Sequence, residues 1–122
     1  MLHEQANILC ADGHSDTREL LAFVLKADGY NISTVATVEE ALTSFETTDF
    51  DLLISEQILP DGTGLDLHQQ LMAQQKPTPI LFFTSVTHPQ ERQLLEERGT
   101  YLAKPAELCI LRQAVFEALR TV

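Results

Sequence analysis

The sequence predicts an α/β fold in which five strands, each followed by a helix, form a three-layer sandwich. The observation that supports this prediction is that short apolar runs alternate five times with longer runs whose apolar residues recur at helical spacing. Such pairs favour parallel strands joined by right-handed crossovers, with helices on both faces of one sheet. With 122 residues, of which 44% are hydrophobic, the chain is expected to fold as a single domain over residues 1–122.

The short apolar runs are predicted strands because each is too short for a helix and is followed by turn-forming or polar residues. They cover residues 7–11, 30–35, 51–55, 80–83 and 101–103. The run at 51–55 is apolar at consecutive positions, which is typical of a strand buried on both faces of a parallel sheet. The run at 30–35 alternates and is rich in β-branched residues, and it follows Gly29, which is expected to end the preceding helix.

Capping signals mark where the helices begin. The pairs with the spacing of a capping box are Asp16 with Glu19, Thr37 with Glu40 and Thr63 with Asp66. Pro89 suits the first position of a fourth helix, which Gly99 is expected to end. The residues expected to face inward from the first three helices are Leu20, Leu21, Val24, Leu25, Ala41, Leu42, Phe45, Leu65, Leu67 and Leu71. In the last helix, predicted over 106–120, they are Leu108, Leu111, Val115, Phe116 and Leu119.

Charge and composition argue against several classes of function. The 18 acidic residues against 8 Lys and Arg give a formal net charge of −10, which argues against direct binding of nucleic acid. The first residues carry no signal-peptide pattern, and no apolar run is long enough to span a membrane. Cys10 and Cys109 lie in apolar surroundings without a CxxC spacing. They are expected to be packed, reduced thiols of a cytoplasmic protein.

Four predicted strands end at residues that can take part in chemistry. Asp12, Glu56, Thr84 and Lys104 come at the ends of the first, third, fourth and fifth strands. Ligands collect at the carboxyl ends of parallel strands. If the strand order is 2-1-3-4-5, as in flavodoxin-like sheets, the first and third strands are neighbours and the four side chains converge. Each residue alone could be structural, but their coincidence at four strand ends predicts a shared site.

At these residues the chain resembles the response-regulator receiver domain, from Asn7 to Leu119. The matching positions are Ile8 to Asp12, Arg18, Gly29, Tyr30, Glu40 to Leu42, Asp51 to Ile54, Pro60, Gly64, Pro79, Ile80, Thr84 and Tyr101 to Pro105. The resemblance implies a CheY-like fold and a role in two-component phosphorelay signalling. In that family a sensor kinase's phosphohistidine phosphorylates an aspartate after the third strand, with Mg²⁺ held by an acid pair after the first. A threonine and a lysine then bind the phosphoryl group, and the last helices and strand rearrange.

The chain departs from the family pattern where this chemistry occurs. Glu56 stands at the phosphoacceptor position, and Gly13 replaces the second residue of the acidic pocket, which leaves Asp12. Mg²⁺ binds weakly to few carboxylates, so weak residual binding at Asp12 and Glu56, or none, is expected. Glu56 also carries its carboxylate one methylene further out, and in-line phosphoryl transfer depends on positioning. The two changes together predict an atypical, degenerate receiver (a pseudo-receiver) that has no cofactor and is not an enzyme.

The retained residues allow two interpretations. Thr84 and Lys104 could hold Glu56 and imitate the phosphorylated state permanently, or they could be kept for packing. Tyr101 matches the aromatic residue that turns inward or outward as a switch in receivers, and Pro105 completes the Lys-Pro pair of the family pattern.

The favoured function is a phosphorylation-independent protein-interaction module. It is expected to contact a sensor kinase or an output domain through its last two helices and fifth strand, and a homodimer is a further possibility. The alternative is a working, Mg²⁺-dependent phosphoacceptor in which another carboxylate substitutes. Asp61 is the obvious substitute, although an acid in the turn after Pro60 is expected to face elsewhere.

Other chemistries have weaker support. The histidines lack the spacing of metal ligands, so surface or capping roles are expected for His3, His14, His68 and His88. A transition-metal site formed by His14 and Asp12 is a weaker alternative. No GxSxG elbow accompanies a serine, which argues against a hydrolase. Neither GxGxxG nor GxxxxGK[ST] occurs, which argues against the usual nucleotide sites.

Overall fold

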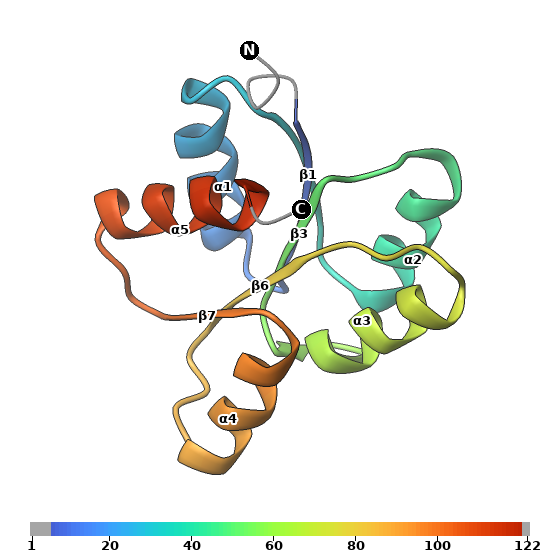
Figure 1. Ribbon diagram of the computed structural model, residues 1–122. Helices are drawn as coiled ribbons and strands as arrows, with labels where there is room; N and C mark the ends of the chain where they lie inside the picture. Colours follow the sequence, from blue (N-terminus) through green and yellow to red (C-terminus); the bar gives the residue numbers. More distant parts are fainter. Residues whose placement is uncertain (1–5, 121–122) are drawn as a thin grey trace.

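The computed structural model describes residues 6–120, which contain a five-stranded parallel sheet with helices on both faces (Figure 1). The strands of this sheet are β1 (Asn7–Ala11), β2 (Asn31–Val35), β3 (Leu52–Ser55), β6 (Ile80–Thr84) and β7 (Thr100–Ala103). The helices are α1 (Ser15–Ala27), α2 (Val38–Thr47), α3 (Gly64–Ala73), α4 (Pro89–Arg98) and α5 (Leu108–Arg120). A short antiparallel pair, β4 (Ile58–Leu59) with β5 (Gly62–Thr63), was not predicted from the sequence.

The strand order is β2-β1-β3-β6-β7, which confirms the predicted flavodoxin-like order 2-1-3-4-5. All pairings within this sheet are parallel. In the register of the central strands, Ala11 of β1 lies opposite Ser55 of β3, and Ser55 lies opposite Phe82 of β6. The residues that follow β1 and β3 therefore leave the sheet side by side.

Two hydrophobic clusters fill the space on either side of the sheet. The first joins β1, β3 and β6 to α1 and α5, through residues that include Cys10, Leu25 and Leu111. The second joins the other face to α2 and α3, and it also takes in Leu95, the buried residue of α4. Figure 1 shows α1 and α5 on one side of the sheet and α2 and α3 on the other. The arrangement confirms the three-layer prediction.

Two of the three predicted capping pairs are confirmed. Thr37 Oγ1 accepts a hydrogen bond from Glu40 N at 3.0 Å, and Thr63 Oγ1 accepts one from Asp66 N at 3.0 Å. The third prediction is wrong, because α1 begins at Ser15 and its N-cap is His14, without a side-chain capping bond. The physical reason is that the Asp12 carboxylate accepts the His14 amide at 2.9 Å, which turns the chain into the helix earlier.

Some residues predicted to face inward are exposed. The side chains concerned are Leu20, Leu108 and Phe116, with exposed fractions of 41%, 47% and 40%. Cys109 is also exposed, whereas Cys10 is buried as predicted. The buried stripe of α5 consists of Leu111, Val115, Ala118 and Leu119. Leu108 is the first residue of α5, and Phe116 lies beside the buried stripe. Both side chains are therefore close to the solvent when this stripe faces the sheet.

No helix in residues 6–120 is both long and apolar enough to cross a membrane. His3, one of the histidines considered above, lies outside the described residues.

Candidate functional site

The four residues predicted to converge meet at the carboxyl edge of the sheet. Asp12 follows β1, Glu56 follows β3, Thr84 is the last residue of β6, and Lys104 follows β7. Asp12, Glu56 and Thr84 are buried polar residues, and Lys104 is partly buried. Their side chains are joined by hydrogen bonds and ion pairs, so the structure brings the four residues together in one cluster.

The Glu56 carboxylate has partners on both oxygens. Oε2 accepts from the Gln57 amide at 2.6 Å and from the Ile58 amide at 3.2 Å, and it also accepts from Thr84 Oγ1. Oε1 lies 3.2 Å from Lys104 Nζ, and only 4% of the side chain is exposed. The backbone bends directly after β3, so the amides of the next two residues point toward the Glu56 side chain. The long glutamate side chain reaches these amides of its own loop.

Lys104 lies between two carboxylates. Its ammonium is 2.7 Å from Asp12 Oδ2 and 3.2 Å from Glu56 Oε1, and 18% of its side chain is exposed. The same nitrogen lies 5.5 Å from the centre of the Phe83 ring. A buried carboxylate is costly unless it is paired, so this single cation compensates two acids that the fold brings together.

Both carboxylate oxygens of Asp12 are engaged by its neighbours. Oδ1 accepts from the His14 amide at 2.9 Å and lies 3.3 Å from His14 Nδ1. Oδ2 accepts from the Lys104 ammonium. The Asp12 carbonyl accepts from the Arg18 guanidinium at 2.7 Å. The His14 side chain is 78% exposed, so its imidazole covers Asp12 from the solvent side. The carboxylate is thereby held in one orientation.

The second position of the acidic pocket, Gly13, is exposed and brings no side chain to the site. A Cβ atom built there would lie 3.3 Å from Cδ of Pro60, so a side chain requires a small shift of that ring. Within residues 6–120 no group of three or more His, Cys, Asp or Glu residues is placed to hold a metal ion. Mg²⁺ requires six oxygens in near-octahedral geometry, and the two carboxylates present both face Lys104. Asp12 and Glu56 are thus the two carboxylates that this site presents, and both are paired with the Lys104 ammonium.

A line of contacts leads from Thr84 to α4. Thr84 Oγ1 accepts from the Val86 amide at 3.0 Å, and the Val86 carbonyl accepts from the Tyr101 hydroxyl at 2.6 Å. The Arg92 guanidinium of α4 lies over the Tyr101 ring, 4.6 Å from its centre. Tyr101 is thus half-buried with its hydroxyl directed to the loop before α4. Pro105 follows Lys104 through a cis peptide bond, and it is exposed.

Gln57 is part of this site, although no sequence pattern singles it out. Its amide donates to Glu56, and its side chain is buried with two hydrogen-bonding partners. Sequence reasoning missed this residue because a glutamine side chain does not titrate and because Gln57 is not part of a recognisable motif. The signal that could have found it is its position directly after the central strand and Glu56.

Other candidate residues have structural roles. The Asp61 carboxylate accepts from the Val38 and Glu39 amides at 2.8 and 3.1 Å, and these bonds, chiefly that of Val38, hold its pKa below the usual range. It therefore faces α2 and not the site, as expected. His88 caps α4 through Gln90 N, which agrees with the capping role predicted for it.

His68 does not have the surface or capping role predicted from its spacing, because it is buried in α3. Its Nε2 lies 2.9 Å from the Thr78 carbonyl oxygen, and its Nδ1 has no hydrogen-bonding partner within residues 6–120. Burial lowers its pKa. Burial likewise raises the pKa of the Cys10 thiol to about 12, so that thiol is unreactive at neutral pH.

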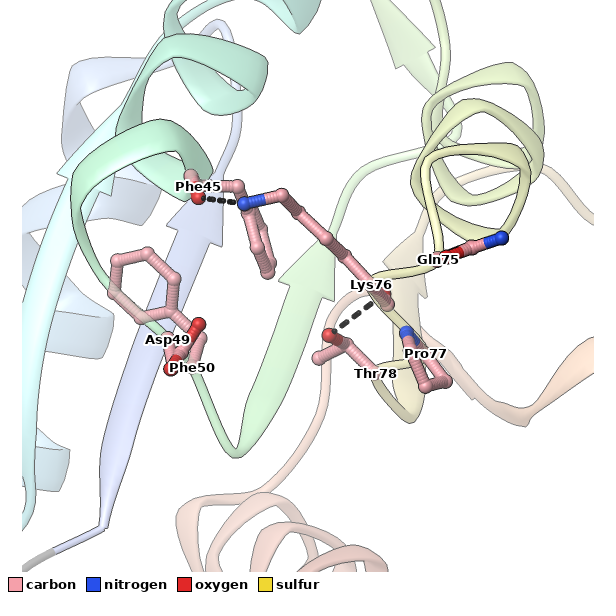
Figure 2. Close-up of a pocket in the computed structure, with 7 residues that line it drawn as sticks. All are labelled: Phe45, Asp49, Phe50, Gln75, Lys76, Pro77 and Thr78. Carbon is pink, nitrogen blue, oxygen red and sulfur yellow. Dashed lines mark hydrogen bonds between the residues drawn. The ribbon is translucent and has the colours of Figure 1, made fainter.

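A cavity of about 190 Å³ lies at the opposite, amino-terminal edge of the sheet (Figure 2). It is lined by Phe45, Asp49, Phe50, Gln75, Lys76, Pro77 and Thr78. Lys76 reaches across it and donates to the Phe45 carbonyl at 2.6 Å, at the end of α2. The cavity is remote from Glu56, because its lining residues precede β3 and β6 whereas Glu56 follows β3.

Comparison with known proteins identifies the same family that the residues suggested. The family model described as "Response regulator receiver domain" matches residues 8–116. Response regulator protein PilR of Pseudomonas aeruginosa is 32% identical over 114 residues, covering 92% of this chain and 26% of PilR. The alkaline phosphatase synthesis transcriptional regulatory protein PhoP of Bacillus subtilis is 33% identical over 100 residues, covering 80% of this chain and 42% of PhoP. This chain thus spans less than half of either relative.

Two solved structures have similar folds and sequences. A two-component response regulator from Clostridium difficile superposes with a TM-score of 0.86 at 32% identity, covering 95% of this chain and 97% of that one. The chemotaxis response regulator CheY4 of Vibrio cholerae gives 0.83 at 29% identity, covering 93% and 98%.

Proposed function

This chain belongs to the response-regulator receiver family, and we propose that it is an atypical receiver domain that signals through protein contacts without phosphorylation of Glu56. In this proposal it is a binding module of a two-component system and not an enzyme. The observation that carries it is the Glu56 carboxylate, which is buried and has partners on both oxygens.

Phosphoryl transfer requires a free carboxylate oxygen in line with the donor phosphorus, beside a divalent ion. Oε1 of Glu56 faces Lys104, and Oε2 faces two amides and Thr84. Oε2 already accepts from three donors, and Oε1 lies against Lys104 in a side chain that is only 4% exposed, so a donor phosphorus could approach Oε1 only by entering a buried site. Gly13 further deprives the site of the acid that would help to hold the ion. Both features argue against reaction at this position.

The contacts of Glu56 favour a permanent imitation of the phosphorylated state over retention for packing alone. In the family, the threonine and lysine at these positions bind the phosphoryl group. Here Thr84 and Lys104 bind the Glu56 carboxylate itself. The extra methylene of glutamate lets its oxygens extend toward these two residues. One carboxylate carries less charge than a phosphoryl group, so the imitation is electrostatically partial.

The partner surface is proposed to lie on α4, β7 and α5, with a sensor kinase or an output domain as the partner. Exposed apolar residues there include Leu94 of α4 and Ile110 of α5, with exposed fractions of 53% and 50%. Arg112 of α5 is not a free contact residue, because it donates two hydrogen bonds to Asp28 at 2.9 and 2.8 Å. Changes at Arg112 therefore test the attachment of α5 to α1 and are unsuited to testing partner binding.

Phosphorylation is the test of this proposal. Incubation with acetyl phosphate, or with beryllofluoride, in the presence of Mg²⁺ should give no covalent adduct and no change in the amide spectra of Thr84 and Tyr101. Glu56→Asp alone should react little, because the ligand missing at Gly13 is still absent. The double change Gly13→Asp with Glu56→Asp should recover partial reactivity, since Asp12, Thr84 and Lys104 remain.

The outcome that contradicts the proposal is an adduct on the wild-type chain, located by mass spectrometry on any carboxylate. That result would establish the alternative, a working phosphoacceptor. An adduct on Asp61 is the least expected form of it, since that carboxylate is bonded to the start of α2.

A further inference from the structure

The buried side chain of Gln57 joins the site to two helices. Its Oε1 accepts from the Leu65 amide of α3 at 3.0 Å, and its Nε2 donates to Glu91 Oε2 of α4 at 3.3 Å. Its own amide donates to Glu56 Oε2 at 2.6 Å. Its carbonyl accepts from the Gly64 amide at 2.9 Å. Both ends of the side chain are therefore committed, and only 4% of the residue is exposed.

Helix α4 has few apolar contacts to hold it in place. Of its 10 residues, all within the described part of the chain, Leu95 alone is buried, and most of the others are charged or amide side chains. A helix with so little buried apolar surface opens locally at a low free-energy cost unless polar contacts oppose the opening. Two of the contacts that do so involve adjacent residues in its first half: Arg92 over Tyr101, and Glu91 with Gln57.

We propose that Gln57 is a positioning residue that ties α4 to the loop bearing Glu56. The inference rests on the proposed function, in which α4 belongs to the partner surface. The contact differs from the line through Thr84, Val86 and Tyr101, because it starts from β3 and reaches α4 without β6 or β7. Glu56 is thus connected to the same part of α4 twice, once through Thr84 and once through Gln57.

The hydrogen bond between Gln57 and Glu91 can be removed and then restored by exchanging the amide and the carboxylate between the two positions. Gln57→Glu keeps an oxygen for the Leu65 amide, but it removes the donor to α4 and places a carboxylate against Glu91. Glu91→Gln alone keeps an oxygen that accepts from Gln57. In the double variant, Gln57→Glu with Glu91→Gln, the amide introduced on α4 can donate to the carboxylate introduced after β3. The contact then re-forms with its direction reversed.

Hydrogen exchange of the α4 amides, measured by NMR on the four proteins, tests the proposal. Gln57→Glu should speed exchange in α4 about fivefold, as expected for the loss of one hydrogen bond, and leave α3 unchanged. Glu91→Gln should speed exchange less than Gln57→Glu does, because it keeps an acceptor for Gln57 and loses only the charge of Glu91 in the first turn of α4. The double variant should return to within about twofold of Glu91→Gln, because its contact is restored.

A second variant covers the case in which Gln57→Glu does not fold. Glu91→Ala removes the acceptor from the partly exposed helix and leaves the buried residue intact, and Glu91→Gln, which loses the same charge from the first turn of α4 but keeps an acceptor, is its matched control. The proposal is overturned by unchanged α4 exchange in Glu91→Ala or Gln57→Glu, or by a double variant that exchanges as fast as Gln57→Glu.

This test and the phosphorylation test can fail separately. A covalent adduct on the wild-type protein defeats the proposed function but leaves the effect of Gln57 on α4 intact. Unchanged exchange in α4 contradicts the proposed positioning role of Gln57, whatever the reactivity of Glu56.

Discussion

The Lys104 ammonium lies 3.2 Å from the Glu56 carboxylate, in a site where only 4% of the glutamate side chain and 18% of the lysine side chain are exposed. The same ammonium contacts Asp12 at 2.7 Å. One cation therefore serves two buried acids, and the stability of the fold should depend on it.

Replacement of Lys104 tests that dependence. Lys104→Met should lower the free energy of unfolding by about 3 kcal/mol, because it leaves two buried carboxylates without their cation. Urea unfolding followed by circular dichroism measures the change. Lys26→Met, at the exposed end of α1, is the control and should change stability by less than about 0.5 kcal/mol. If Lys104→Met unfolds at the wild-type urea concentration, the ammonium does not stabilise this site.

A second prediction concerns the metal. Mg²⁺ should leave the thermal midpoint of the wild type unchanged once ionic strength is matched with NaCl, since both site carboxylates face Lys104. Gly13→Asp should acquire a Mg²⁺-dependent rise, because it adds the missing ligand; Mg²⁺ at about ten times its dissociation constant would stabilise the variant by about 1.4 kcal/mol. Gly13→Asn adds nearly the same volume without the charge and should show no such rise. Saturable Mg²⁺ binding by the wild type would contradict this prediction.

The buried His68 predicts a dependence on pH. Its pKa lies below the ordinary value of 6.5, because burial disfavours the charged imidazole. The unfolded chain therefore takes up the proton at a higher pH than the folded protein does. The corresponding stability is fully present above about pH 6.5 and is lost as the pH falls from there to the folded pKa.

The measurement for His68 is urea unfolding of the wild type and His68→Gln between about pH 7.5 and 5. The variant keeps an amide that can donate to the Thr78 carbonyl, and its stability should change less over this range. His88→Gln, which alters the exposed cap of α4, should retain the wild-type dependence. The same loss of pH dependence in both variants would show that burial of His68 is not its cause.

A fourth prediction concerns Asp61. Asp61→Ala should destabilise the start of α2, because the Val38 and Glu39 amides lose their acceptors. Hydrogen exchange in α2 should speed up, while Asp61→Asn, which keeps one oxygen, should have a smaller effect. The lowered pKa of Asp61 implies that its charge contributes stability above the ordinary aspartate pKa, and this contribution is lost as the pH falls through the lowered value. Unchanged α2 exchange in Asp61→Ala would show that the Asp61 carboxylate does not stabilise the start of α2.

The strand ends were predicted from the sequence better than the helix surfaces. Asp12, Glu56 and Thr84 each come at the end of a short apolar run, and in a parallel sheet such positions lie at one edge whatever the details of packing. The position of Phe116 depends on where α5 begins and how it is rotated, which its own residues do not determine. Asp16 had the spacing of a cap, but Asp12 accepts from the amide of His14, two residues further on, and the helix begins directly afterwards at Ser15.

Two further features of the site could not be predicted for a different reason. The role of Gln57 depends on Glu91, which is distant in sequence, and neither residue has a pattern that reveals the contact. The small β4–β5 pair is joined by the turn at Pro60 and Asp61, and these residues are equally typical of an irregular loop. Long-range contacts between polar side chains require the three-dimensional structure.

The cation that balances Asp12 and Glu56 is covalently part of the polypeptide. Unlike a bound ion, it cannot be removed by a chelator or diluted when the medium changes, and no phosphatase can act on a glutamate side chain. Under the function proposed above, in which Glu56 is not phosphorylated, no chemical step resets the domain. The strength of its signal would then follow the number of copies present in the cell, so that synthesis and proteolysis would replace phosphoryl transfer as the means of control.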